Sequence, residues 1–193
     1  MTNTTNKTNL IPPHGGYRNL KSYQMAEIIY DLTQTFCKKF IYSSYTSNRT
    51  YTRTYDQMVQ AARSGKQNIA EASVDSGTSK KIELKLVGIA RGSLEELLQD
   101  YEDYLRQNNL PLWPPEDLLV KKVRSLCYVP NKSYTTYMSY MGSPEGAANT
   151  LICLIHQANY LLDRQLNTLQ NDFLENGGFT ERLYKMRKEH NEK

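Results

Sequence analysis

The sequence has no long hydrophobic run. Its longest uninterrupted apolar stretch is Leu151–Ile155, far short of the roughly 20 residues that a membrane-spanning helix needs. Residues 1–9 are rich in Thr and Asn and lack the apolar segment of a secretory signal. We therefore expect no membrane partner and a cytoplasmic location.

Cysteine and histidine are scarce. Cys37, Cys127 and Cys153 form an odd set without paired spacing, which does not indicate a secreted disulfide framework. Cys153 and His156 are the best metal pair, because residues three apart on a helix share a face. A zinc site needs three or four ligands, and the other Cys and His residues are scattered. We therefore predict no metal and no cofactor, and interpret this pair as a buried thiol beside a polar-edge histidine.

The common catalytic motifs are also missing. The sequence has no phosphate loop, no Gly-x-Ser-x-Gly elbow and no His-Glu-x-x-His pair. Glu95 and Glu96 are adjacent, so on a helix they face different directions. Ser93 has no neighbouring base in the sequence and falls on a core-facing stripe. These absences predict no catalytic residue and a protein that is not an enzyme.

Helical periodicity is what the sequence has in abundance. Hydrophobic residues make up 39% and charged residues 23% of the chain, as in an ordinary soluble domain. Apolar residues recur at steps of three and four, which predicts four long helices at about 20–40, 51–74, 79–107 and 143–176. Prolines after Leu110 break the third helix, and shorter helices are expected at 116–127 and after Gly177-Gly178.

Residues at the predicted helix ends support this division. Gly77 can end the second helix, and Thr78 or Ser79 can cap the third. Ser143 and Pro144 give a strong start to the fourth long helix. The predicted fold is all-α: an antiparallel up-down-up-down four-helix bundle, with an extra short helix between helices three and four and a short C-terminal helix.

Three segments follow from this prediction. Residues 1–16 form a flexible N-terminal arm, residues 17–176 form the bundle with an insertion at 108–142, and residues 177–193 form a C-terminal helical tail. Small residues lie where the helices should touch: Ala61, Ser64, Gly65, Ala72, Gly88 and Gly92. Glycine within a helix costs about 1 kcal/mol relative to alanine, which suggests close approach of another segment. Because this set exceeds the needs of one core, we predict a homo-oligomer.

Positive charge is concentrated in the first half of the chain. Residues 1–100 hold 13 Lys and Arg against 9 acids, whereas the remaining residues hold 11 of each. Such an excess can attract phosphate, and nearby tyrosines can stack on unpaired bases. The candidate nucleic-acid-binding residues are Arg49, Arg53, Arg63, Lys66, Lys80, Lys81, Lys85 and Arg91, interleaved with Tyr42, Tyr45, Tyr51 and Tyr55.

A second basic cluster lies in the insertion. It comprises Lys121, Lys122, Arg124 and Lys132, adjoining Tyr128, Tyr134, Tyr137 and Tyr140. The alternative for both clusters is that the cations form a solvated face while the tyrosines pack the helix ends.

Asn68 and Glu71 form a candidate structural polar pair, because residues three apart share a helix face. They could form a buried recognition site. We favour a hydrogen-bonding pair that fixes helix register or contacts a neighbouring subunit, because buried polar groups must be satisfied.

Two stretches, Asn68–Glu71 and Ile89–Leu97, together with the run at 57–64, resemble the bacterial four-helix-bundle proteins known as 23S rRNA intervening-sequence proteins. Ala72 stands where that family usually has Gly. The stretch from Ala148 to Glu181 resembles the variant with a four-helix-bundle suffix. A similar bundle is the accessory variability determinant of diversity-generating retroelements, a basic pentamer that binds reverse transcriptase and nucleic acid.

The resemblance implies an antiparallel bundle in a five-fold ring, so a pentamer is favoured. It also implies RNA or single-stranded DNA and a nucleic-acid-processing protein as partners. We therefore expect a non-enzymatic oligomeric helical-bundle protein that binds nucleic acid, RNA or a nucleoprotein, through a basic face. The alternative is a structural or scaffold oligomer that binds another protein and no nucleic acid.

Overall fold

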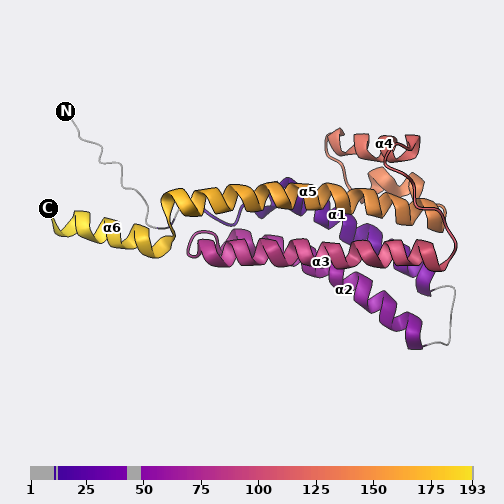
Figure 1. The fold of residues 1–193 in the computed structure, drawn as a ribbon, viewed down its shortest axis with the longest axis horizontal. Coiled ribbons are helices and arrows are strands. Elements are labelled where there is room, and N and C mark those ends of the chain that lie inside the picture. Colours follow the sequence, from indigo (N-terminus) through magenta and orange to yellow (C-terminus); the bar gives the residue numbers. More distant parts are fainter. Residues whose placement is uncertain (1–10, 12, 43–48, 193) are drawn as a thin grey trace.

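The computed structural model of the chain describes residues 11, 13–42 and 49–192, and every regular element among them is helical. This confirms the all-α prediction (Figure 1). The α-helices are α1 (Lys21–Phe36), α2 (Arg49–Asp75), α3 (Lys80–Gln107), α4 (Leu118–Ser125), α5 (Pro144–Asn176) and α6 (Phe179–Asn191). Shorter helical segments are η1 (Tyr17–Asn19), η2 (Cys37–Tyr42), η3 (Leu126–Tyr128) and η4 (Tyr134–Tyr140). Among the described residues, no helix has the length and apolar character to cross a bilayer.

The predicted helix starts are largely confirmed. The Ser79 hydroxyl accepts a hydrogen bond from the Ile82 amide at 3.2 Å, and the Ser143 hydroxyl accepts one from the Gly146 amide at 3.1 Å. The end of the first helix differs from the prediction. α1 ends at Phe36 and the chain continues as the π-helical segment η2.

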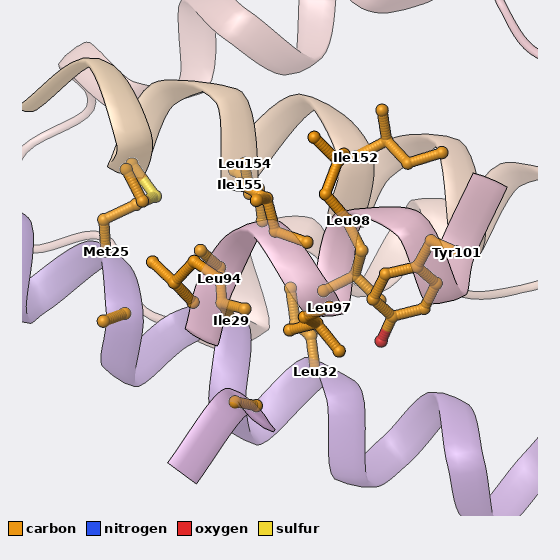
Figure 2. Close-up of a cluster of buried hydrophobic side chains, with 14 of the residues drawn as sticks. Met25, Ile29, Leu32, Leu94, Leu97, Leu98, Tyr101, Ile152, Leu154 and Ile155 are labelled. Carbon is orange, nitrogen blue, oxygen red and sulfur yellow. The ribbon is translucent and has the colours of Figure 1, made fainter. Parts of the chain in front are cut away.

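The four long helices α1, α2, α3 and α5 pack against one another. α2 contacts α1 and α3, and α5 contacts the same two helices from the other side (Figure 1). Their shared core is shown in Figure 2, with side chains from α1, α3 and α5: Met25, Ile29, Leu32, Leu94, Leu97, Leu98, Tyr101, Ile152, Leu154 and Ile155. Burial of this apolar surface is the main stabilising contribution to the fold.

Aromatic packing closes the core at the end of α1. The Phe36 ring lies 5.0 Å from the ring of Tyr101 and 4.9 Å from that of Tyr104, both edge-on. The buried Tyr101 hydroxyl donates to the Thr33 hydroxyl at 3.0 Å. A fully buried tyrosine therefore keeps its polar group satisfied, as a low-dielectric core requires.

The small residues have two different environments. A Cβ at Gly65 would lie 2.8 Å from Leu94 Cδ2, so glycine permits the close approach of α2 to α3. Gly88 and Gly92, on α3, would meet nothing within 4 Å. The expected close approach is thus found at Gly65, while none of the described residues supplies such a neighbour for Gly88 or Gly92.

The segment between α3 and α5 is anchored on the start of α5. The Trp113 amide donates to Asn149 Oδ1 and its indole Nε1 donates to Glu145 Oε1, each at 2.8 Å. The Asn149 amide in turn donates to the Pro111 carbonyl at 2.9 Å. α4 packs on α5 through the buried Val120 and Val123. This places the opposite face of α4 in solvent.

The two ends of the described chain differ. The Gly15 amide donates to the Ser73 carbonyl at 2.9 Å, so the last residues of the predicted arm contact the end of α2. Residues 1–10 and 12 lie outside the described residues, and their predicted flexibility stays a prediction. α6 continues beyond α5 and packs along none of the other described helices (Figure 1).

Candidate nucleic-acid interface

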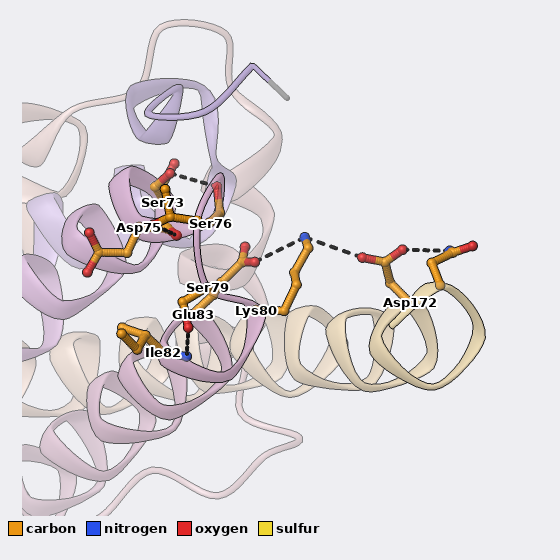
Figure 3. Close-up of polar contacts among 10 residues, drawn as sticks. Ser73, Asp75, Ser76, Ser79, Lys80, Ile82, Glu83 and Asp172 are labelled. Carbon is orange, nitrogen blue, oxygen red and sulfur yellow. Dashed lines mark hydrogen bonds and ion pairs between the residues drawn. The ribbon is translucent and has the colours of Figure 1, made fainter. Parts of the chain in front are cut away.

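Lys80 is held in an ion-pair network and does not project freely. Its Nζ lies 3.1 Å from Glu83 Oε2 and 3.3 Å from Asp172 Oδ2, so it joins the start of α3 to α5 (Figure 3). The Glu83 side chain is nearly buried, and burial raises the pKa of its carboxyl against the opposing effect of Lys80. The hydrogen bond from Asn176 lowers the pKa of Asp172, and Lys80 lowers it further. Lys80 thus neutralises two carboxylates of its own chain.

Arg91 makes a second link between α3 and α5. Its Nε lies 3.1 Å from Asp163 Oδ1, and its guanidinium also pairs with Glu95. The Glu95 carboxylate accepts a further hydrogen bond from Asn159 at 3.1 Å. Because both carboxylates already balance its charge, Arg91 is a weak candidate for binding phosphate.

Lys66 faces α1. Its Nζ lies 4.3 Å from the centre of the Tyr30 ring, which is a cation–π contact between α2 and α1. Lys66 is half-buried there. Its charge therefore contributes to helix packing and is only partly available to a ligand.

Three further candidates are exposed: Arg63, Lys81 and Lys85. None of the ion pairs among the described residues includes them. Lys81 and Lys85 lie one helical turn apart on α3 and share a face. Arg63 precedes Ser64, whose hydroxyl contacts that of Ser93 on α3, so along the helix pair it lies roughly 12 Å beyond Lys85. We call these three residues the exposed cation row.

Arg49 and Arg53 add little to this row. Arg53 is exposed but lines a hollow of about 810 Å³ between α2 and α3, together with Asp56, Glu96 and Asp100. Those carboxylates repel phosphate. Arg49 is part of α2, but its side chain lies outside the described part of the structure, as do those of Tyr42, Tyr45 and Tyr51.

Asn68 and Glu71 point to different surroundings. The Asn68 amide donates to the Ser64 carbonyl at 2.8 Å and to the Ser64 hydroxyl at 3.1 Å. That hydroxyl lies 2.9 Å from the Ser93 hydroxyl on α3. Glu71 is exposed. Asn68 therefore contributes to the contact between α2 and α3 without Glu71.

The second cluster is only partly assembled. Lys122 and Arg124 are exposed on α4, and Tyr128 directly after it is 86% exposed. Lys121 forms an exposed ion pair with Glu116 at 3.3 Å. Tyr137 is fully buried, and burial raises its pKa to about 12. A usable patch therefore consists of Lys122, Arg124 and Tyr128, which we call the α4 patch.

Sequence reasoning missed the acidic hollow beside the basic residues. The one available signal was the spacing of Glu96 and Asp100, which are four residues apart on α3 and therefore share a face. Asp56 comes from α2, and its position beside them depends on how the two helices pack.

Cys153 and His156, the candidate metal pair from the sequence, lie in different environments. Cys153 is buried, with its pKa raised to about 11 by burial, whereas His156 is exposed. The described residues contain no group of three His, Cys, Asp or Glu side chains placed to hold a metal ion.

No protein-family model, no curated protein and no solved structure matches this chain.

Proposed function

We propose that this chain is a non-enzymatic, cytoplasmic helical-bundle protein that binds RNA or single-stranded DNA through the exposed cation row. The α4 patch would provide a second contact, with Tyr128 stacking on an unpaired base. We further propose membership of the 23S rRNA intervening-sequence protein family. A nucleic-acid-processing protein is the corresponding protein partner.

One observation carries the proposal. Among the predicted cations, Lys80 and Arg91 are neutralised by carboxylates of α3 and α5, while Arg63, Lys81 and Lys85 are exposed and outside every described ion pair. Exposed lysines without an acidic partner contribute little to folding. They can, however, replace the counterions around phosphate.

The direction of the four long helices and the oligomeric state belong to the same proposal. We infer an antiparallel up-down-up-down bundle of α1, α2, α3 and α5. Lys80 near the start of α3 pairs with Asp172, whereas Glu95 farther along α3 bonds Asn159. The α5 partners therefore come earlier in the chain as α3 proceeds, which supports opposite directions for these two helices. We also propose a homo-oligomer, with a pentamer favoured by the family resemblance.

The test is the double reversal Lys81→Glu/Lys85→Glu. We expect it to weaken binding to RNA or single-stranded DNA at least tenfold in an anisotropy titration, because two attractive charges become repulsive. The melting temperature should stay within a few degrees of wild type, since both side chains are exposed. The matched control is Lys21→Glu/Lys38→Glu, which changes the net charge equally at two other exposed positions.

Two outcomes would contradict the proposal. One is equal weakening by both double variants, which would indicate an effect of net charge alone. The other is the absence of saturable wild-type binding near about 100 mM salt, where screening of exposed charges is moderate. The scaffold alternative, a bundle that binds only another protein, would then replace it. The acidic hollow between α2 and α3 is the observation that favours this alternative.

A further inference from the structure

The hollow between α2 and α3 has a floor of small side chains. Ala61 and Ser64 line it from α2 and Ser93 lines it from α3, with the two serine hydroxyls 2.9 Å apart. α2 diverges from α3 toward its own N-terminal end, which opens the hollow (Figure 1). A volume of about 810 Å³ leaves space for several large side chains.

The walls of the hollow are acidic. Asp56, Glu96 and Asp100 line it, and Arg53 is the one cation among its lining residues. Burial raises the pKa of Asp100, and the neighbouring negative charges of Asp103 and Glu96 raise it further. Carboxylates that repel one another in a partly desolvated site favour a cationic occupant.

α6 carries basic and aromatic side chains that complement the acidic walls and small-residue floor of the hollow. Its 13 residues carry four basic side chains against the acidic Glu181 and Glu189. The Tyr184 ring is 73% exposed, and Arg187 and Lys188 follow it one turn later on the same side. α6 thus presents an aromatic and basic face, on which Lys188 lies 3.8 Å from Glu192, and this face packs along no other described helix.

The length of the hollow also matches the length of α6. The α2 wall from Arg53 to Ser64 spans roughly 17 Å, and α6 is roughly 20 Å long. The two lie at opposite ends of the subunit. α6 follows the end of α5 that is joined to Lys80, whereas Asp100 is 20 residues, roughly 30 Å, farther along α3. A subunit therefore cannot fill its own hollow with its own α6.

We propose that α6 of one copy docks into the α2–α3 hollow of a second copy. Tyr184 covers the floor of small side chains, while Arg187 and Lys188 pair with Glu96 and Asp100. This inference rests on the homo-oligomer in the proposed function and assigns its interface. Because the two surfaces differ, the contact is head-to-tail and closes into a ring when the rotation permits.

The test uses one charge reversal on each side: Glu96→Lys/Asp100→Lys in the hollow and Arg187→Glu/Lys188→Glu on α6. By light scattering, wild type should form an oligomer at micromolar concentration. Each variant alone should fall to the subunit mass of about 22.3 kDa. An equimolar mixture should regain a mass well above one subunit, because each reversed surface then meets its complement.

The matched control is Glu71→Lys/Glu102→Lys, which reverses two exposed acids outside the hollow and should keep the wild-type mass. Circular dichroism of each sample reports folding, and the α6 variant changes only a helix that packs along no other element. If wild type assembles and the α6 reversal keeps its mass, the docking proposal is wrong while the proposed oligomer stands. If wild type is a monomer, both fail, and the nucleic-acid titration still tests binding separately.

Discussion

At the residue scale, Lys80 pairs with the nearly buried Glu83 of its own helix and links α3 to Asp172 of α5. Glu83 is 7% exposed, and its partner Lys80 is shared with Asp172 (Figure 3). Burial of a carboxylate is unfavourable unless a cation and hydrogen bonds compensate it. Here one shared lysine leaves the pKa of Glu83 raised, so compensation is incomplete.

The pH dependence of this joint is testable with Glu83→Gln. A carboxyl whose folded pKa is raised stabilises the fold below its ordinary pKa, and this contribution is lost as the pH rises through the folded value. Glutamine carries no charge, so the variant should gain stability relative to wild type between acid and neutral pH. Urea unfolding at several pH values measures the difference.

The exposed Glu102→Gln variant is the control, and its difference from wild type should vary little over the same range. If Glu83→Gln instead loses stability relative to wild type as the pH rises, the ion pair with Lys80 outweighs burial and this account of the joint is wrong.

At the element scale, α2 and α3 pack through a close contact at Gly65 and leave α3 open at Gly88. Gly65→Leu should lower the free energy of unfolding by about 1–3 kcal/mol, because the new side chain collides with Leu94 in the core. Gly88→Leu should raise it by about 0.5–1 kcal/mol, because leucine favours the helix and meets open space. Denaturant unfolding of both variants gives the comparison.

Among the described residues nothing lies within 4 Å of a Cβ at Gly88, so the close approach expected there from the sequence is not found within the chain. Destabilisation of the subunit by Gly88→Leu would show that α3 is covered by something absent from its own chain. A reduced oligomer mass without loss of helix stability would place the subunit contact on α3 and not on α6.

Local signals were sufficient to predict most elements. Ser79 and Ser143 marked helix starts because their hydroxyls bond amides three residues later, an interaction within one turn. The end of α1 was misplaced because Phe36 and Phe40 continue the apolar period into η2, where the backbone is π-helical. Periodicity reports which face is buried and does not report the hydrogen-bond pattern.

Long-range pairings in the candidate site could not be predicted in the same way. The sequence predicted Lys80 and Arg91 to be available for phosphate. In the structure Lys80 pairs with Asp172 and Arg91 with Asp163, acids of α5 that lie 92 and 72 residues later in the chain. Such partners depend on how helices are aligned, which composition and spacing do not encode. The exposure of Lys81 and Lys85, by contrast, follows from their place on the outer face of a predicted helix.

At the scale of the whole molecule, charges of opposite sign are separated along the bundle. The acidic hollow lies toward one end of α3, and the basic α6 extends beyond the other (Figure 1). The exposed cation row comes from α2 and α3. Head-to-tail assembly would neutralise the ends and repeat the row in every subunit, which multiplies a modest charge.

The most direct measurement of the central claim is the affinity of wild type for single-stranded RNA as a function of salt concentration. Each phosphate neutralised on a single strand contributes a slope of about −0.7 in a plot of log affinity against log salt. Three exposed cations per subunit therefore predict a slope of about −2 or steeper. A slope near zero, or no saturable binding near about 100 mM salt, would contradict nucleic-acid binding by this surface.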